Sequence, residues 1–255
     1  QGRPRERKYP QQTDHSLHAY PPAAIVHKRK ERKCRNPVSR RMDIPSGRRH
    51  HDAMRTPSFL WLARHGETDW NRAGRAQGHT DIPLNETGRG QARRLAQRLR
   101  GEPLAALVAS DLLRASETAR IVGEAAGLEP LLQREWREVN LGALEGETDA
   151  ARAHGELISA LAASPGPLGA GGETFAAFVE RIDRGYRHLC EAHAGEVVAV
   201  VAHGGTLKTL IARLIGLPPE GIGRLSLRGN GGLSAVDFRH GRPQLVLLND
   251  TSHMG

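Results

Sequence analysis

The chain has few of the features of small secreted proteins or of proteins that span a membrane. Its 255 residues include two cysteines, Cys34 and Cys190, too few for a disulfide framework or a cysteine metal site. No stretch approaches the roughly 18 consecutive apolar residues of a membrane span. The best apolar run near the start, residues 23–26, is too short for a signal peptide. We therefore expect a cytoplasmic protein with no membrane partner.

Excess positive charge is absent from most of the chain. The net charge is +9, but residues 1–55 hold 15 basic and 5 acidic residues, whereas residues 56–255 hold 22 and 23. The first segment also has six prolines and no Phe or Trp, so it cannot bury enough apolar surface to offset its ordering entropy. We expect a basic, disordered extension over residues 1–55. Nucleic-acid binding by this extension is the less favoured interpretation.

From residue 56 onward, short apolar runs alternate with amphipathic segments. The apolar runs predict strands at 59–63, 104–109, 129–133, 197–202, 233–238 and 244–248. The amphipathic segments predict helices at 87–100, 112–126, 150–163, 174–193 and 206–215. This alternation predicts one α/β domain over 56–255, a three-layer α/β/α sandwich with a mostly parallel central sheet. A short turn joins the last two strands, so one antiparallel strand is expected.

Charged and polar residues follow four of the predicted strands. The strands lead into Arg64-His65, into Arg114, into Arg137-Glu138 and into His203-Gly204. The carboxyl ends of parallel strands meet at one rim, where open α/β sheets bind their ligands. We therefore expect these histidines, arginines and the carboxylate to converge there.

Two features of this rim favour a phosphate ligand. Gly204 and Gly205 open a predicted helix, whose first N–H groups form a ready anion site. The arginine guanidinium binds phosphate oxygens in pairs. The sequence therefore predicts a phosphorylated substrate.

Four blocks of sequence carry a family resemblance. They are Leu62-Ala63-Arg64-His65-Gly66-Glu67-Thr68 with Trp70-Asn71 and Gln77-Gly78, Ser110 to Ala119, Arg137 to Gly142 with Glu145-Gly146, and Ala202-His203-Gly204-Gly205. In this order they resemble the histidine phosphatase superfamily, the phosphoglycerate mutase-like proteins, over about residues 58–253. The resemblance implies that family's fold and an enzyme that uses no metal and no cofactor.

The resemblance also implies a role for each candidate site residue. His65 is the expected nucleophile and carrier of the phosphoryl group, and the charges of Arg64 and Arg114 are expected to keep its ring neutral. Both arginines and His203 are expected to hold the phosphoryl oxygens. Glu138 is expected to protonate the leaving alkoxide and then to accept a proton from water. Further hydrogen bonds to phosphate or substrate are expected from Asn71, Gln77, Gly78 and Gly204.

Several functions stay open within this resemblance. The first is a phosphomonoesterase acting on a small phosphorylated metabolite, similar to α-ribazole phosphatases, glucosyl-3-phosphoglycerate phosphatases and broad-specificity acid phosphatases. The first alternative is a phosphoglycerate mutase-type phosphotransferase, less favoured because the segment after Gly142 looks too short for the mutase insertions. The second is a non-catalytic phospho-ligand or nucleic-acid-binding protein.

Two further points are left open by the sequence. Relatives often have an aromatic residue where this chain has Leu144, which bears on the leaving-group pocket rather than on phosphoryl transfer. The protein is expected to be a monomer or a dimer.

Overall fold

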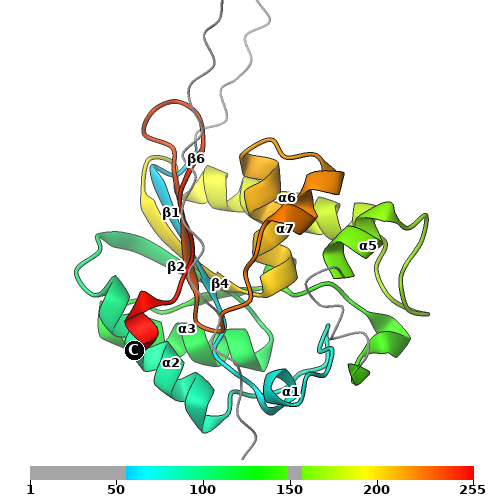
Figure 1. Cartoon of the computed structure of the whole chain (residues 1–255). Helices are drawn as coiled ribbons and strands as arrows, with labels where there is room; N and C mark the ends of the chain where they lie inside the picture. Colours follow the sequence, from blue (N-terminus) through cyan, green and yellow to red (C-terminus); the bar gives the residue numbers. More distant parts are fainter. Residues whose placement is uncertain (1–55, 149–156) are drawn as a thin grey trace, which may run out of the picture. The chain divides into compact units, whose positions relative to one another are not determined.

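The computed structural model describes residues 56–148 and 157–255 (Figure 1). The predicted extension over residues 1–55 and the first part of the predicted helix at 150–163 lie outside the described residues. None of the described helices is long and apolar enough to cross a membrane.

A six-stranded sheet forms the middle layer, in the order β3-β2-β4-β1-β5-β6. Its strands are β1 (Phe59–Arg64), β2 (Leu104–Ser110), β3 (Leu131–Gln133), β4 (Val197–Ala202), β5 (Leu233–Asp237) and β6 (Gln244–Asp250). The pairs β1–β4, β2–β4 and β2–β3 are parallel, and β5 is antiparallel to both of its neighbours. Among the described strands β5 alone is therefore reversed, which confirms the predicted mostly parallel sheet.

Helices cover both faces of this sheet (Figure 1). They are α2 (Glu86–Leu99) and α3 (Leu113–Ala126) on one face, and α6 (Phe175–Ala192) and α7 (Gly204–Leu214) on the other. Side chains of a strand alternate between faces. Trp61 of β1 accordingly packs in the cluster that contains Leu95 of α2, and Leu62 in the cluster that contains Phe178 of α6. The predicted three-layer sandwich is confirmed.

Shorter elements complete the domain. They are α1 (Asp69–Arg72), α5 (Leu157–Ala163) and the 3₁₀ helices η1 (Arg134–Trp136), η2 (Gly142–Leu144), η4 (Pro219–Arg224) and η5 (Ser252–Met254). Local sequence explains where three of the helices begin and where one of them ends. The side chains of Thr68, Asn85 and Thr174 accept a backbone N–H at the starts of α1, α2 and α6. Gly127 ends α3 in the left-handed conformation, with φ +69°.

The register of the parallel strands aligns their carboxyl ends. Arg64 pairs with Ala202 across β1 and β4, and Ser110 pairs with Gln133 across β2 and β3. Residues that follow these strands therefore emerge at one rim, as the sequence predicts.

Candidate active site

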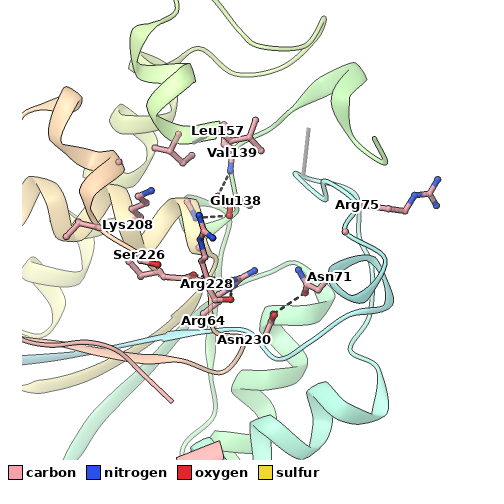
Figure 2. Close-up of a pocket in the computed structure, with 17 residues that line it drawn as sticks. Arg64, Asn71, Arg75, Glu138, Val139, Leu157, Lys208, Ser226, Arg228 and Asn230 are labelled. Atoms are coloured by element: carbon pink, nitrogen blue, oxygen red, sulfur yellow. Dashed lines mark hydrogen bonds between the residues drawn. The ribbon is translucent and has the colours of Figure 1, made fainter. Parts of the chain in front are cut away.

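A cavity of about 310 Å³ opens at this rim (Figure 2). Four of the residues predicted from sequence line it, namely Arg64, Asn71, Glu138 and Gly204. The other five, His65, Gln77, Gly78, Arg114 and His203, are not among its lining residues. They lie beside it, bonded to one another or to the loops that form its wall.

His65 follows β1 and has a defined tautomer. Its side chain is buried, with the residue 3% exposed, and its Nδ1 lies 2.7 Å from the carbonyl oxygen of Gly66. A carbonyl can only accept, so Nδ1 carries the proton. A neutral His65 ring therefore has its lone pair on Nε2, as a nucleophile requires.

Arg64 is buried at the inner end of the cavity. Its Nη1 donates to the carbonyl oxygens of Leu227, at 3.0 Å, and Arg228, at 2.7 Å, whereas its Nε has no hydrogen-bond partner among the described residues. Burial lowers the pKa of Arg64, and the nearby carboxylate of Glu138 opposes that shift. A Cβ on Gly204 would lie 3.6 Å from Nε. A buried, unpaired N–H beside the first turn of α7 fits an anion.

Arg114 and His203 form a bonded pair behind this position. Arg114 donates from Nε to Nδ1 of His203 at 3.2 Å, and from Nη1 and Nη2 to the carbonyl oxygens of Thr80 and Gly78. Burial lowers the pKa of Arg114 to about 10, still well above neutral pH. Burial, and then the charge of Arg114, hold the pKa of His203 well below its usual value. His203 is therefore neutral, with its Nε2–H directed to Oγ of Ser110 at 2.9 Å.

The two histidine rings lie next to each other, with centroids 5.1 Å apart. In this arrangement both ring nitrogens of His203 bond to protein groups. His203, which follows β4, therefore orients Arg114 of α3, a contact that the sequence did not reveal.

Glu138 lies against the start of α7. Its Oε2 accepts the N–H of Gly205 at 2.9 Å and its Oε1 accepts the N–H of Val139 at 3.0 Å. Gly205 is necessary here, because a Cβ at this position would collide with Oε1 of Glu138. Glu138 therefore lies in the same cavity as Arg64, across the first turn of α7 (Figure 2).

An arginine of α6 holds the backbone around Glu138. Arg181 donates to the carbonyl oxygens of Glu135, Arg137 and Glu138 at 2.9–3.0 Å and forms a two-point ion pair with Glu173. Oε2 of Glu173 also accepts the N–H of Asn140 at 2.8 Å. Sequence reasoning missed this pair, because no short motif connects α6 to the loop that it holds.

Glu145, the neighbouring carboxylate, has a different position. Its oxygens accept the backbone N–H groups of His79, Thr80 and Leu141. Gly78, with φ +51°, allows this approach, since a Cβ there would collide with the Glu145 carboxylate. Glu145 therefore holds the loop whose carbonyl groups bind Arg114, and Glu138 alone of the two lines the cavity.

The predicted amide side chains are held by hydrogen bonds near His65. Oδ1 of Asn71 accepts from Asn230 at 3.1 Å, and Oε1 of Gln77 accepts from Thr68 at 3.0 Å. Asn230 also donates to the His65 carbonyl at 3.3 Å, and it was not foreseen. Leu144 packs against the core cluster and does not line the cavity.

Among residues 56–148 and 157–255, no three His, Cys, Asp or Glu side chains gather in a way that could hold a metal ion. The positive charge at the inner end of the cavity comes from the guanidinium group of Arg64, with that of Arg114 behind it.

Comparison with known proteins agrees with this geometry. The model of the histidine phosphatase superfamily (branch 1) matches residues 60–251. The chain is 36% identical over 184 residues to a probable phosphoglycerate mutase of Photorhabdus laumondii, covering 71% of this chain and 85% of the relative.

Two solved structures are similar as well. The mycobacterial glucosyl-3-phosphoglycerate phosphatase has a TM-score of 0.67 at 30% identity, covering 76% of this chain and 100% of that chain. The phosphoserine phosphatase of Entamoeba histolytica, in complex with 3-phosphoglyceric acid, has a TM-score of 0.67 at 31% identity, covering 77% and 99%.

Proposed function

The chain belongs to the histidine phosphatase superfamily, and from this premise we propose that it is a phosphomonoesterase that hydrolyses a small phosphorylated metabolite through a phosphohistidine at His65. The observation that supports this most strongly is the unpaired, buried Nε of Arg64 beside Gly204, in a cavity that also contains the Glu138 carboxylate. The anion site at Arg64 and the candidate proton donor, Glu138, therefore lie in one cavity.

In the first half-reaction, Nε2 of His65 attacks phosphorus and the ester P–O bond breaks. The phosphoryl oxygens lie against Arg64 Nε and the first turn of α7, where positive charge stabilises the transition state. Glu138, protonated when substrate binds, transfers its proton to the leaving alkoxide. The products are an alcohol and a phosphohistidine.

In the second half-reaction, water replaces the alcohol. The Glu138 carboxylate accepts a proton as water attacks phosphorus, the P–N bond breaks, and inorganic phosphate leaves. Splitting one displacement into two in this way is the usual benefit of covalent catalysis. Arg114 contributes its positive charge from behind the site, with His203 as its positioning partner.

We further propose that this reaction uses no metal ion, because Arg64 and Arg114 supply the charge that a metal supplies in other phosphoryl-transfer enzymes. Phosphate release is expected to be unchanged in excess chelator. A loss of activity that added divalent metal restores would overturn this part of the proposal.

A mutase is the second candidate, because curated relatives are named probable phosphoglycerate mutases. Both reactions share the phosphohistidine and differ in whether water or the product alcohol receives the phosphoryl group. The acid loop, which resembles the phosphatase branch, and the short segment after Gly142 favour water.

The experiment is a panel of phosphorylated metabolites assayed for phosphate release, with the isomerisation of 3-phosphoglycerate to 2-phosphoglycerate followed alongside. Phosphate release at rates well above isomerisation is expected. Fast isomerisation with little phosphate release would assign the mutase activity instead.

A further inference from the structure

The backbone of His65 is held by the loop over residues 229–232, which precedes β5. The carbonyl oxygen of His65 accepts the N–H of Gly231 at 3.1 Å and the side-chain amide of Asn230 at 3.3 Å. Asn230 also donates, at 3.4 Å, to the carbonyl oxygen of Gly66, to which Nδ1 of His65 donates. This loop therefore contacts both carbonyl groups that fix the position of the His65 ring.

The C-terminal segment packs against the other side of this loop. The 3₁₀ helix η5, drawn in red at the end of the chain in Figure 1, lies beside α2. A Cβ on Gly231 would collide with Cε of Met254, and a Cβ on Gly229 would collide with Cγ2 of Thr251. The loop therefore lies between the C-terminal segment on one side and the backbone of His65 on the other.

Local hydrogen bonds set the path of the C-terminal segment. Asn249, near the end of β6, has φ +48°, and it is the one non-glycine residue with a positive φ in the part of the chain that the structure describes. Its N–H donates to Oγ of Ser234 at 2.9 Å. The carboxylate of Asp250 accepts both the N–H and the hydroxyl of Ser252. These contacts direct the chain from β6 into η5 and onto the loop.

One polar side chain of η5 donates to the loop. Nε2 of His253 lies 3.1 Å from the carbonyl oxygen of Gly231, which can only accept, so Nε2 carries the proton. Burial lowers the pKa of His253, which keeps the ring neutral near pH 7. Nδ1 of His253 is buried and has no hydrogen-bond partner among the described residues. An apolar side chain would avoid this unpaired nitrogen, so the specific contribution of the imidazole is its bond to Gly231.

Resting on the proposed function, in which His65 is the nucleophile, we propose that His253 is a positioning residue for phosphoryl transfer. Its Nε2–H fixes the carbonyl group of Gly231, and the N–H of Gly231 fixes the backbone of His65. Without this connection the loop over residues 229–232 relaxes, and the His65 ring loses the orientation that attack on phosphorus requires.

Three substitutions separate the hydrogen bond of His253 from the space that its ring fills. His253→Gln keeps an N–H donor close to the position of Nε2, His253→Leu removes it, and His253→Asn retains an amide that is one carbon too short to contact Gly231. The single-turnover rate constant should fall about 10-fold in His253→Leu and His253→Asn and stay within about 3-fold of wild type in His253→Gln, because misplacing a reacting group by about 1 Å costs up to 10²-fold.

The dependence on the leaving group distinguishes this role from that of Glu138. The loss should be equal for p-nitrophenyl phosphate and alkyl phosphates, with an unchanged half-saturating concentration, because both classes require attack by His65. A loss confined to alkyl phosphates would place the defect at Glu138 and overturn the proposal. Equal losses in His253→Gln and His253→Leu would also overturn it, because the ring would then only fill space.

The matched control is His240→Leu. His240 is exposed, and it lies in the turn at the opposite end of the β5–β6 hairpin from η5. This variant loses a histidine of the same hairpin without touching the loop, so its single-turnover rate constant should equal that of the wild type.

Nitrogen-15 NMR of the histidine rings tests the same connection without turnover. At about pH 8, where histidine is neutral, the His65 signals are identified by their absence from His65→Ala. Wild type, His253→Gln and His240→Leu should show the tautomer with the proton on Nδ1, whereas the signals of His253→Leu should move toward the average of the two tautomers.

This measurement separates failure of the inference from failure of the proposed function. If the wild type hydrolyses no phosphomonoester but the His65 signals still move in His253→Leu and not in His253→Gln, the positioning contact stands and the phosphatase function fails. Unchanged His65 signals in His253→Leu would overturn the proposal whatever the activity.

Discussion

The inner and outer ends of the cavity are built in different ways. At and behind the inner end, Arg64, His65, Arg114 and His203 are buried and bonded to backbone carbonyls or to one another. At the outer end, Arg228 is exposed and has no side-chain partner among the described residues. Groups that carry the proposed chemistry are thus held by packing. The outer end is held less firmly, so its exposed side chain can change with little effect on the fold.

Among the buried groups at the inner end, replacing His65 should cause the largest loss of activity. His65→Ala removes the proposed nucleophile, so kcat/KM for any phosphomonoester should fall by about 10⁴-fold or more, as removal of other enzymic nucleophiles does. Steady-state assays with p-nitrophenyl phosphate measure this. His188→Ala, an exposed position on α6, is the control and should retain full activity. Substantial activity in a folded His65→Ala protein would contradict the assignment.

Replacing Glu138 should have the next largest effect. Glu138→Gln keeps the shape of the side chain but removes the proton donor, and kcat should fall by about 10²–10⁴-fold for alkyl phosphates. The loss should be much smaller for p-nitrophenyl phosphate, whose leaving group needs no proton. An equal loss for both classes of substrate would exclude Glu138 as the general acid.

Disrupting the Arg181–Glu173 pair should weaken the same step indirectly. Arg181→Met removes the donors that hold the backbone at Glu135, Arg137 and Glu138, and misplacing a reacting group by about 1 Å can cost up to 10²-fold. We expect about a 10- to 100-fold loss of kcat for alkyl phosphates and a smaller loss for p-nitrophenyl phosphate.

The control for this prediction lies on the same helix. Arg184→Met removes an exposed pair with Glu180, which contributes little. Equal losses for good and poor leaving groups in Arg181→Met would show a general structural defect and contradict a positioning role.

The smallest expected effect concerns stability rather than activity. Burial holds the pKa of His203 well below 6.5, so below about pH 6.5 the unfolded chain gains a proton that the folded protein does not. The free energy of unfolding should therefore decrease as the pH is lowered below about 6.5. His203 should contribute about 1.4 kcal/mol per pH unit to this decrease until its pKa in the folded protein is reached.

Urea unfolding at several pH values between 5.5 and 7.5 measures this slope. His203→Gln should flatten it, whereas His188→Gln, at an exposed position, should not. Equal slopes in the wild type and His203→Gln would contradict a buried, neutral His203.

Local sequence was sufficient for the strands, for the long helices α2, α3, α6 and α7 and for the residues that follow each strand, because periodicity and strand direction are properties of short segments. Arg181 and Asn230 could not be recognised in the same way. Arg181 bonds to Glu138 across 43 positions of the chain and Asn230 to His65 across 165. Their roles depend on tertiary contacts, which the sequence pattern does not encode.

The choice between Glu138 and Glu145 shows the same limit of sequence patterns. The family resemblance favours Glu138, but only tertiary contacts explain why Glu145 is unsuitable. Its oxygens accept the N–H groups of His79, Thr80 and Leu141, and it does not line the cavity.

The central claim is that a phosphoryl group resides on His65 during turnover. Rapid quenching of the protein with a ³²P-labelled phosphomonoester, followed by peptide mapping under alkaline conditions, should find acid-labile label on the peptide that contains His65 and none in the His65→Ala variant. Turnover at the normal rate with label absent from His65, or present on another residue, would contradict the account.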